Sequence, residues 1–315
     1  MLNLEIAKQI GEPICPQLPV PVEISAIADT FTAEVGEKVW RYTAVDSSLD
    51  ICLQVDANGA MTTVKRTPTG DAELTFMGLN SKYEYVLIDD ILSETDNTQV
   101  LGRRKASITR AMDKREVYTI ITALLAKTAS YLPGVEPWEV VPASADDLYD
   151  VFMKMKHKVE DYGDGYVLLV GSTVKEKMDT YDKDNVASFN YNITFAARLA
   201  AMGIEVKKVY GKVELTDGGG ETVIMDPKKA ILVAKNSRVA EGKPIKFVRR
   251  KIGADIAKLM GADVDTAQRA LFVTPTPVNL AGVPTLAYGV YGYESVIFTV
   301  TNPYAIVVSD LSTVV

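Results

Sequence analysis

The sequence has very few of the residues that common metal sites and hydrolytic centres need. Its 315 residues include two cysteines, Cys15 and Cys52, and a single histidine, His157. Neither cysteine has a partner at metal-ligand spacing, and two thiols in so long a chain do not form a disulfide framework. The histidine stands among lysines, so no Ser–His–Asp triad can be built around it, and the ligands of an ordinary zinc site are missing.

Long apolar runs and an excess of positive charge are also lacking. No stretch approaches the roughly 20 uninterrupted apolar residues of a membrane span, and residues 1–11 do not have the layout of a signal peptide. The net charge is −7 at pH 7, opposite to the bias of a free-standing DNA-binding protein. With 47% hydrophobic and 24% charged residues, the composition is that of an ordinary globular protein. Because span and signal-peptide patterns are lacking, we expect the chain to fold in the cytoplasm.

The first 38 residues predict an extended arm. Four prolines lie between Glu12 and Glu23, where they remove amide donors and prevent a helix. The arm is nevertheless too apolar for a solvated tail, as shown by Ile14, Leu18, Val20, Val22, Ile24 and Ile27. These side chains need a surface to lie on, either that of their own subunit or that of a neighbour.

Residues 40–76 predict a long two-stranded hairpin. Apolar and polar residues alternate from Asp50 to Val55, residues 56–59 (Asp-Ala-Asn-Gly) supply turn chemistry, and residues 61–66 return. An isolated hairpin is marginally stable in water. The hairpin therefore packs inside its own subunit or is steadied by another, and the sequence favours neither.

Residues 99–131 predict one very long helix. They contain no proline, their apolar residues have helical spacing, and Pro133 and Gly134 follow as a stop. Such a helix is roughly 45 Å long at 1.5 Å per residue. Its first half is basic, with Arg103, Arg104, Lys105, Arg110, Lys114 and Arg115 against only Asp113 and Glu116. This basic half is a solvated face or a nucleic-acid contact.

Residues 137–212 have the pattern of an α/β unit. In order we expect a helix at 146–160 capped by Ser144, a buried strand at 166–170, a helix through Met178, a helix at 193–202 and a strand at 204–209.

The remaining residues predict late strands with one proline-rich connection. After a glycine turn at 217–220 we expect strands at 229–234 and 244–251, a helix at 255–260, a connection containing Pro275, Pro277 and Pro284, and strands at 295–301 and 304–308.

The strongest enzyme-like feature is Gly171-Ser172-Thr173, which leads from a buried strand into a helix. Such a turn can bind phosphate through free amides, but it lacks the full glycine fingerprint and the lysine of a P-loop. Neighbouring carboxylates, Asp89 with Asp90 and Asp146 with Asp147, point to different faces and do not form an acid/base pair. We therefore assign no catalytic, cofactor-binding or metal-ligating residue.

The order of these parts resembles the Hong Kong 97-type capsid fold of tailed-phage major capsid proteins. Residues 229–238 (KAILVAKNSR) look like the family's strand that enters the peripheral domain, and residues 294–307 (ESVIFTVTNPYAIV) look like its closing segment. The resemblance implies an α+β fold with an N-terminal arm, an extended loop, a peripheral domain with a long spine helix, and an axial domain.

The resemblance also implies domain boundaries. Residues 1–39 would be the arm and 40–78 the extended loop. The peripheral domain would comprise 79–135 and 222–252, and the axial domain 136–221. Residues 253–315 would supply late strands that the two domains share. The stretch from Gly253 to Tyr288 is longer than the family pattern leads us to expect.

By this resemblance the chain is a structural protein of the virion and not an enzyme. It would assemble with copies of itself, as hexamers and pentamers, into an icosahedral or prolate head shell. The shell would enclose double-stranded DNA without sequence specificity. A separate scaffolding protein, a portal and a decoration protein would be its further partners, and neither a cofactor nor a membrane is implied.

Two other readings stay open. The same fold serves encapsulins, nanocompartment shells that hold an enzyme cargo, and the presence of cargo in place of DNA would distinguish them. The second reading is a nucleotide-using α/β enzyme built on Gly171-Ser172-Thr173, which nucleotide binding would test.

Overall fold

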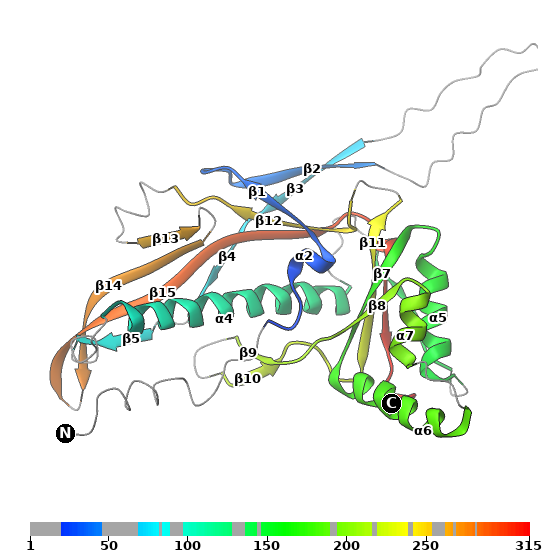
Figure 1. Ribbon diagram of the computed structural model, residues 1–315. Helices are drawn as coiled ribbons and strands as arrows, with labels where there is room; N and C mark the ends of the chain where they lie inside the picture. Colours follow the sequence, from blue (N-terminus) through cyan, green and yellow to red (C-terminus); the bar gives the residue numbers. More distant parts are fainter. Residues whose placement is uncertain are drawn as a thin grey trace, which may run out of the picture.

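The computed structural model describes residues 20–45, 69–81, 84–88, 97–127, 136–143, 146–189, 194–215, 219–238, 242–253, 262–266, 269–280 and 282–315. Within these ranges the chain forms two large sheets and one long helix, α4 (Figure 1). The observed architecture is of the expected α+β class.

One sheet has seven strands and gathers the late part of the chain. Its order is β1-β12-β15-β14-β13, and β4 and β5 pair with the same long strand, β15. The strands are β1 (Asp29–Ala33), β4 (Met77–Asn80), β5 (Glu84–Leu87), β12 (Ile245–Arg250), β13 (Ala262–Thr266), β14 (Arg269–Leu280) and β15 (Val283–Val300). Only β1 and β12 run parallel.

The expected proline-rich connection is wrong, because its prolines lie inside the β14–β15 hairpin. Pro275 pairs with Tyr288, Pro277 with Leu286, and Pro284 with Asn279. These pairs fall at every second rung, so they share one hydrogen-bonding class, and prolines cost no ladder bond where the missing N–H would point away from the partner. Pro275 and Pro277 also lie beyond the rungs at which β13 pairs with β14.

The helix α4 (Asn97–Leu125) lies along this sheet (Figure 1). Its 29 residues correspond to about 43 Å. Contact with β15 is close, because a Cβ on Gly292 would lie 2.5 Å from Met112 Sδ and 2.9 Å from Ile108 Cγ2. The helix ends before the expected residue 131. Lys127 adopts a left-handed φ of 55° and its N–H bonds to Leu124 O, which closes the last turn.

The second sheet has five strands and is buried on both faces. Its order is β6 (Trp138–Glu139), β16 (Ile306–Asp310), β11 (Lys229–Ser237), β7 (Gly163–Val170) and β8 (Ile204–Lys208). Alternate side chains enter two different cores: Val167 and Leu169 face one, and Leu168 and Val170 face the other. Period-2 alternation between two apolar cores explains why 166–170 and 229–234 read as continuous apolar runs.

Helices from the middle of the chain cover one face of this sheet. They are α5 (Leu148–Val159), α6 (Ser172–Phe189) and α7 (Phe195–Ala201). The expected cap of α5, Ser144, lies outside the described residues, and Asp147 is the N-cap, accepting a bond from the Asp150 N–H at 2.8 Å. Thr194 caps α7 in the same way. The other face packs on the C-terminal half of α4, so the two sheets share one core.

Part of the predicted arm folds onto its own subunit. Residues Val22, Ile24 and Ile27 are buried in the shared core, around the short helix α2 (Ile24–Ile27). The surface that these three side chains need is therefore supplied by their own chain. Residues 1–19, which hold the rest of the arm, lie outside the described residues.

The base of the predicted hairpin is present as a separate two-stranded sheet. Strands β2 (Val39–Val45) and β3 (Thr69–Thr75) pair from Val39↔Thr75 to Val45↔Thr69. Leu74 and Phe76 pack against Ala33, Val248 and Ile297 of the seven-stranded sheet. Residues 46–68, where the rest of the hairpin was predicted, lie outside the described residues, as does the helix expected at 255–260.

Two ranges of the expected domain plan contribute to both sheets. Residues 222–252 supply β11 to the five-stranded sheet and β12 to the seven-stranded sheet. Residues 253–315 supply β13, β14 and β15 to the seven-stranded sheet, and after the 3-10 turn η1 (Pro303–Ala305) they supply β16 to the other. A small sheet of β9 (Lys212–Glu214) and β10 (Glu221–Val223) lies beside α4.

Candidate functional site

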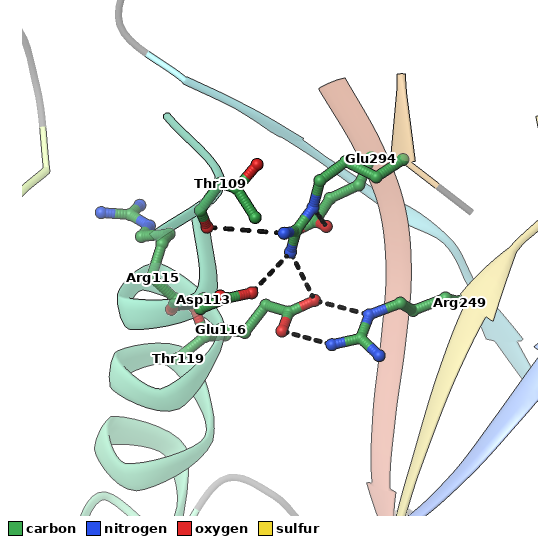
Figure 2. A network of polar contacts seen from close by, with 8 residues as sticks. Thr109, Asp113, Arg115, Glu116, Thr119, Arg249 and Glu294 are labelled. Carbon is green, nitrogen blue, oxygen red and sulfur yellow. Dashed lines mark hydrogen bonds and ion pairs between the residues drawn. The ribbon is translucent and has the colours of Figure 1, made fainter. Parts of the chain in front are cut away.

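An ion-pair network joins α4 to the seven-stranded sheet (Figure 2). Its first half is a fork between Glu116 of α4 and Arg249 of β12. Arg249 Nε donates to Glu116 Oε1 at 2.8 Å, and a terminal nitrogen donates to Oε2 at 2.6 Å. Glu116 is 1% exposed. Two parallel charge-assisted bonds to a buried carboxylate fix both the distance and the orientation of helix and strand.

The second half of the network is centred on Arg269 of β14. Its Nε donates to Glu294 Oε2 on β15 at 2.7 Å, and its Nη2 donates to Asp113 Oδ1 on α4 at 3.0 Å. A weaker bond reaches the Thr109 carbonyl at 3.4 Å, and Glu116 Oε1 lies 3.6 Å from the same Nη2. One guanidinium therefore connects two strands to two turns of the helix.

The network holds one more acid than base. Asp113, Glu116 and Glu294 face Arg249 and Arg269, and Glu294 is fully buried. Its second oxygen, Oε1, has no donor among the described residues. Burial and the neighbouring Glu116 charge raise the pKa of Glu294 to about 7, against the opposing pull of Arg269 and Arg249. The Glu294 carboxyl therefore keeps its proton to a higher pH than an ordinary glutamate does.

A carboxyl group with a raised pKa is often catalytic, but structural ion-pair networks produce the same shift. A depression of about 540 Å³ beside the network is lined by Asp113, Glu116 and Arg249 but not by Glu294, which is 0% exposed. Among the described residues, the Glu294 carboxyl is thus closed off from solvent. The arrangement can hold the helix on the sheet and bind a proton. We call this network of Asp113, Glu116, Arg249, Arg269 and Glu294 the joint between α4 and the seven-stranded sheet.

A second ionic contact fastens the N-terminal segment. Asp29, the first residue of β1, accepts bonds from Lys246 Nζ at 2.6 Å and from the Lys243 N–H at 2.8 Å. Burial alone would raise the pKa of Asp29, but the bonds from Lys246 and Lys243 outweigh it and hold the pKa below its usual value. The contact joins distant parts of the chain, since Asp29 and Lys246 are 217 positions apart in the sequence.

The local geometry does not favour phosphate binding by the amides of Gly171-Ser172-Thr173. The Thr173 and Val174 N–H groups both donate to the Pro227 carbonyl, at 3.1 and 3.2 Å. A Cβ on Gly171 would lie 2.3 Å from the Asp226 carbonyl oxygen. The glycine is therefore needed for packing against residues 226–227, and two of the amides that would bind phosphate already have a partner.

The remaining residues considered from the sequence have structural places or lie outside the described residues. Asp147 caps α5, and Asp146 bonds the Ala143 N–H and Lys154. His157 is exposed and contacts Glu160 at 3.0 Å. Cys15, Cys52, Asp89 and Asp90 are outside the described ranges. Within those ranges no three metal-ligand side chains cluster, and no helix is long and apolar enough to cross a membrane.

Sequence reasoning missed the network. Its one visible trace was that Asp113 and Glu116, the acids in the basic half of the long helix, are three residues apart and so share a helix face. The arginine partners could not be found from the sequence, because Glu116 and Arg249 are separated by 133 positions.

Comparisons with known proteins show which solved structures have a similar fold. No family model and no curated protein matches the sequence. The capsid of an empty GTA particle matches with a TM-score of 0.58 at 13% identity, covering 99% of each chain. The mature capsid of bacteriophage PhiM1 matches with a TM-score of 0.56 at 10% identity, covering 96% of this chain and 90% of that one.

A nanocompartment shell has a similar fold. The holo-SrpI encapsulin complex from Synechococcus elongatus matches with a TM-score of 0.50 at 15% identity, covering 98% of this chain and 95% of that one. At such identities the likeness concerns the fold alone. The chain has the fold of phage capsid and related shell proteins, and the resemblance to Hong Kong 97-like capsid proteins is confirmed at that level.

Proposed function

We propose that the chain is the major capsid protein of a tailed bacteriophage and builds a head shell around double-stranded DNA. The observation that carries this proposal is the similarity of fold to capsid subunits over almost the entire chain, at 99% coverage for the GTA capsid. A match of that extent spans both large sheets and the long helix. It therefore favours a role that uses the whole subunit as a building unit and not a single site.

The proposed parts follow the resemblance. Residues 1–39 are the arm and 40–78 the extended loop. Residues 79–135 and 222–252 form the peripheral domain with α4 as its spine, residues 136–221 form the axial domain, and 253–315 are shared. Hexamers and pentamers form from these subunits. A separate scaffolding protein, a portal and a decoration protein are the partners that such a shell requires or accepts, and the chain itself performs no catalysis.

Exposed apolar side chains on the β14–β15 hairpin and on β5 support self-association. Val283 is 62% exposed, Leu286 52% and Tyr85, on the adjoining strand β5, 47%. Covering such side chains with an adjacent copy contributes roughly 25 cal/mol per Å² of buried apolar area. Because assembly acts on the folded subunit only, each contact also stabilises the fold by mass action.

Electron microscopy of the purified chain, alone and with a co-expressed scaffolding protein, tests shell formation. We expect closed particles with pentameric and hexameric capsomers. Leu286→Glu should abolish assembly and leave the folded monomer intact, whereas Leu286→Met should still assemble. A chain that stays monomeric under every condition, with or without a scaffold, contradicts the proposal.

An encapsulin-type nanocompartment is the second candidate, because the SrpI encapsulin shares the fold at a comparable level. Particles collected from the organism that makes the chain distinguish the two. Nuclease-protected double-stranded DNA supports the capsid role. A folded enzyme inside DNA-free particles supports the nanocompartment.

A further inference from the structure

The long helix sorts its charges between its two sides. Asp113 and Glu116 point to the sheet, where Arg269 and Arg249 neutralise them (Figure 2). Arg110 is exposed on the same helix, and Lys114 follows one turn later. Neither has an acidic partner among the described residues. The buried network thus neutralises Asp113 and Glu116. Arg110 and Lys114 are left without a carboxylate partner among the described residues.

Lysines from two further elements meet this side of the helix. A depression of about 430 Å³ is lined by Lys114 of α4, Lys208 at the end of β8 and Lys212 at the start of β9. Its only acidic lining residue among those described is Glu221, which lies 3.4 Å from Lys212 Nζ. Lys208 is exposed and, within the described ranges, has no carboxylate partner. We call Arg110, Lys114, Lys208 and Lys212 the basic face.

The chemistry of the basic face fits phosphate groups spaced along a backbone. Three of its cations, Arg110 and Lys114 on α4 and Lys208 on β8, have no carboxylate partner among the described residues. Lysine ammonium groups bind phosphate as point charges. Tyr210 also lines the depression. The amides at the start of α6 take no part, because the Thr173 and Val174 N–H groups bond to Pro227. Binding would therefore be electrostatic and independent of base sequence.

We propose that the basic face binds the phosphodiester backbone of nucleic acid, and that it is the surface of the subunit turned toward the DNA inside the shell. The identity of the ligand depends on the proposed capsid function. On a chain whose net charge is −7, a local basic face can contact the packaged DNA while the acidic remainder repels it. This keeps the interaction weak and salt-dependent.

The test is the salt dependence of duplex DNA binding by dissociated capsomers, measured by fluorescence anisotropy. We expect the triple variant R110Q/K114Q/K208Q to lower the slope of log affinity against log salt by about 2 to 3, since each phosphate contact contributes about 0.9. The matched control K154Q/K235Q/K251Q removes three positive charges that are paired with Asp146, Glu205 and Glu34. It should leave the slope unchanged.

Two further binding measurements complete the test. The charge-preserving variant R110K/K114R/K208R should keep the wild-type slope, which separates loss of charge from loss of fold. Inorganic phosphate at matched ionic strength should not displace the DNA. Equal slopes in wild type and triple variant, equal falls in triple and control variants, or displacement by inorganic phosphate would each overturn the inference.

Electron microscopy of the same variants keeps this inference separate from the proposed function. Shells that form normally from a triple variant with an unchanged slope refute the basic face alone. Failure of the wild-type chain to form any shell refutes the proposed function instead.

Discussion

The five-stranded sheet and the joint between α4 and the seven-stranded sheet are held together by different physics. Strand β7 is buried on both faces by apolar side chains, Leu168 and Leu169 being 0% exposed on opposite sides. Helix α4 also packs Ile108 and Met112 on its sheet, but Glu116 and Asp113 add ion pairs whose charge count leaves one carboxylate in excess. Apolar packing is indifferent to pH, whereas the joint is not. The stability of the five-stranded sheet should therefore not depend on pH, whereas the stability of the joint should.

The largest effect should come from breaking the joint at its centre. Glu116→Ala leaves Arg249 without its two charge-assisted bonds in a partly buried site, and breaking such a pair costs about 3–5 kcal/mol. Urea unfolding at neutral pH measures the loss. Glu205→Ala, which removes an exposed partner of Lys235 and Lys207, is the control and should change stability little. Equal losses in both variants would show that burial does not govern the network.

A comparable loss is expected in the apolar region, but without pH dependence. Leu168→Ala deletes a fully buried side chain, which typically costs about 2–5 kcal/mol including the cavity. The difference in unfolding free energy from wild type should be the same at pH 5 and pH 8. A difference that changes with pH would mean that the two regions are coupled more tightly than their contacts indicate.

Glu294→Gln should expose the pH dependence of the joint. The raised pKa, from 4.5 to about 7, means that the folded state holds the proton more tightly than the unfolded state. The stability from this group is therefore complete below about pH 4.5 and is lost as the pH rises through about 7. Gln cannot ionise, so the variant should gain on wild type between pH 5 and pH 8.

The gain of Glu294→Gln is on the order of 3 kcal/mol if the whole shift is expressed, at about 1.4 kcal/mol per pKa unit. Urea unfolding of both proteins across that pH range measures it, and titrations common to both cancel in the difference. A difference that stays flat with pH would show that Glu294 is already ionised in the folded protein.

The smallest effect on stability is expected at the ion pair between Asp29 and Lys246. Asp29→Asn weakens the bonds from Lys246 and Lys243 and should cost about 1–2 kcal/mol at neutral pH. The pKa of Asp29 is lowered in the fold, so its contribution is present above the unfolded value near 3.8 and disappears as the pH falls through the folded value. Hydrogen exchange of the β1 amides should accelerate in the variant. Unchanged exchange would mean that Val22, Ile24 and Ile27 hold the segment without the ion pair.

The elements that could be predicted from the sequence are those with a local cause. The long helix, the strand at 166–170 and the strand at 229–234 follow from periodicity, and Gly203 ends its helix as expected, with a φ of 78°. The β14–β15 hairpin was missed because Pro275, Pro277 and Pro284 read as a connection. Only the pairing register reveals that the N–H groups they lack are not needed for the ladder.

The candidate site could not be predicted, because its partners meet only through topology. Arg249 belongs to the strand expected at 244–251, but the strand of Arg269 was not expected, and Glu294 lies within a strand between Tyr293 and Ser295. A buried carboxyl group in a strand carries no local signature. Its place at the helix is decided by Gly292, whose missing side chain lets α4 approach β15.

Strand β16 occupies an internal position in the five-stranded sheet, between β6 and β11. That sheet therefore has a gap until residues 306–310 have been synthesised, and both cores it separates stay open for the same time. A growing chain cannot complete this sheet while the ribosome still holds those residues. Fragments of the chain that stop short of β16 should therefore be unable to close either core.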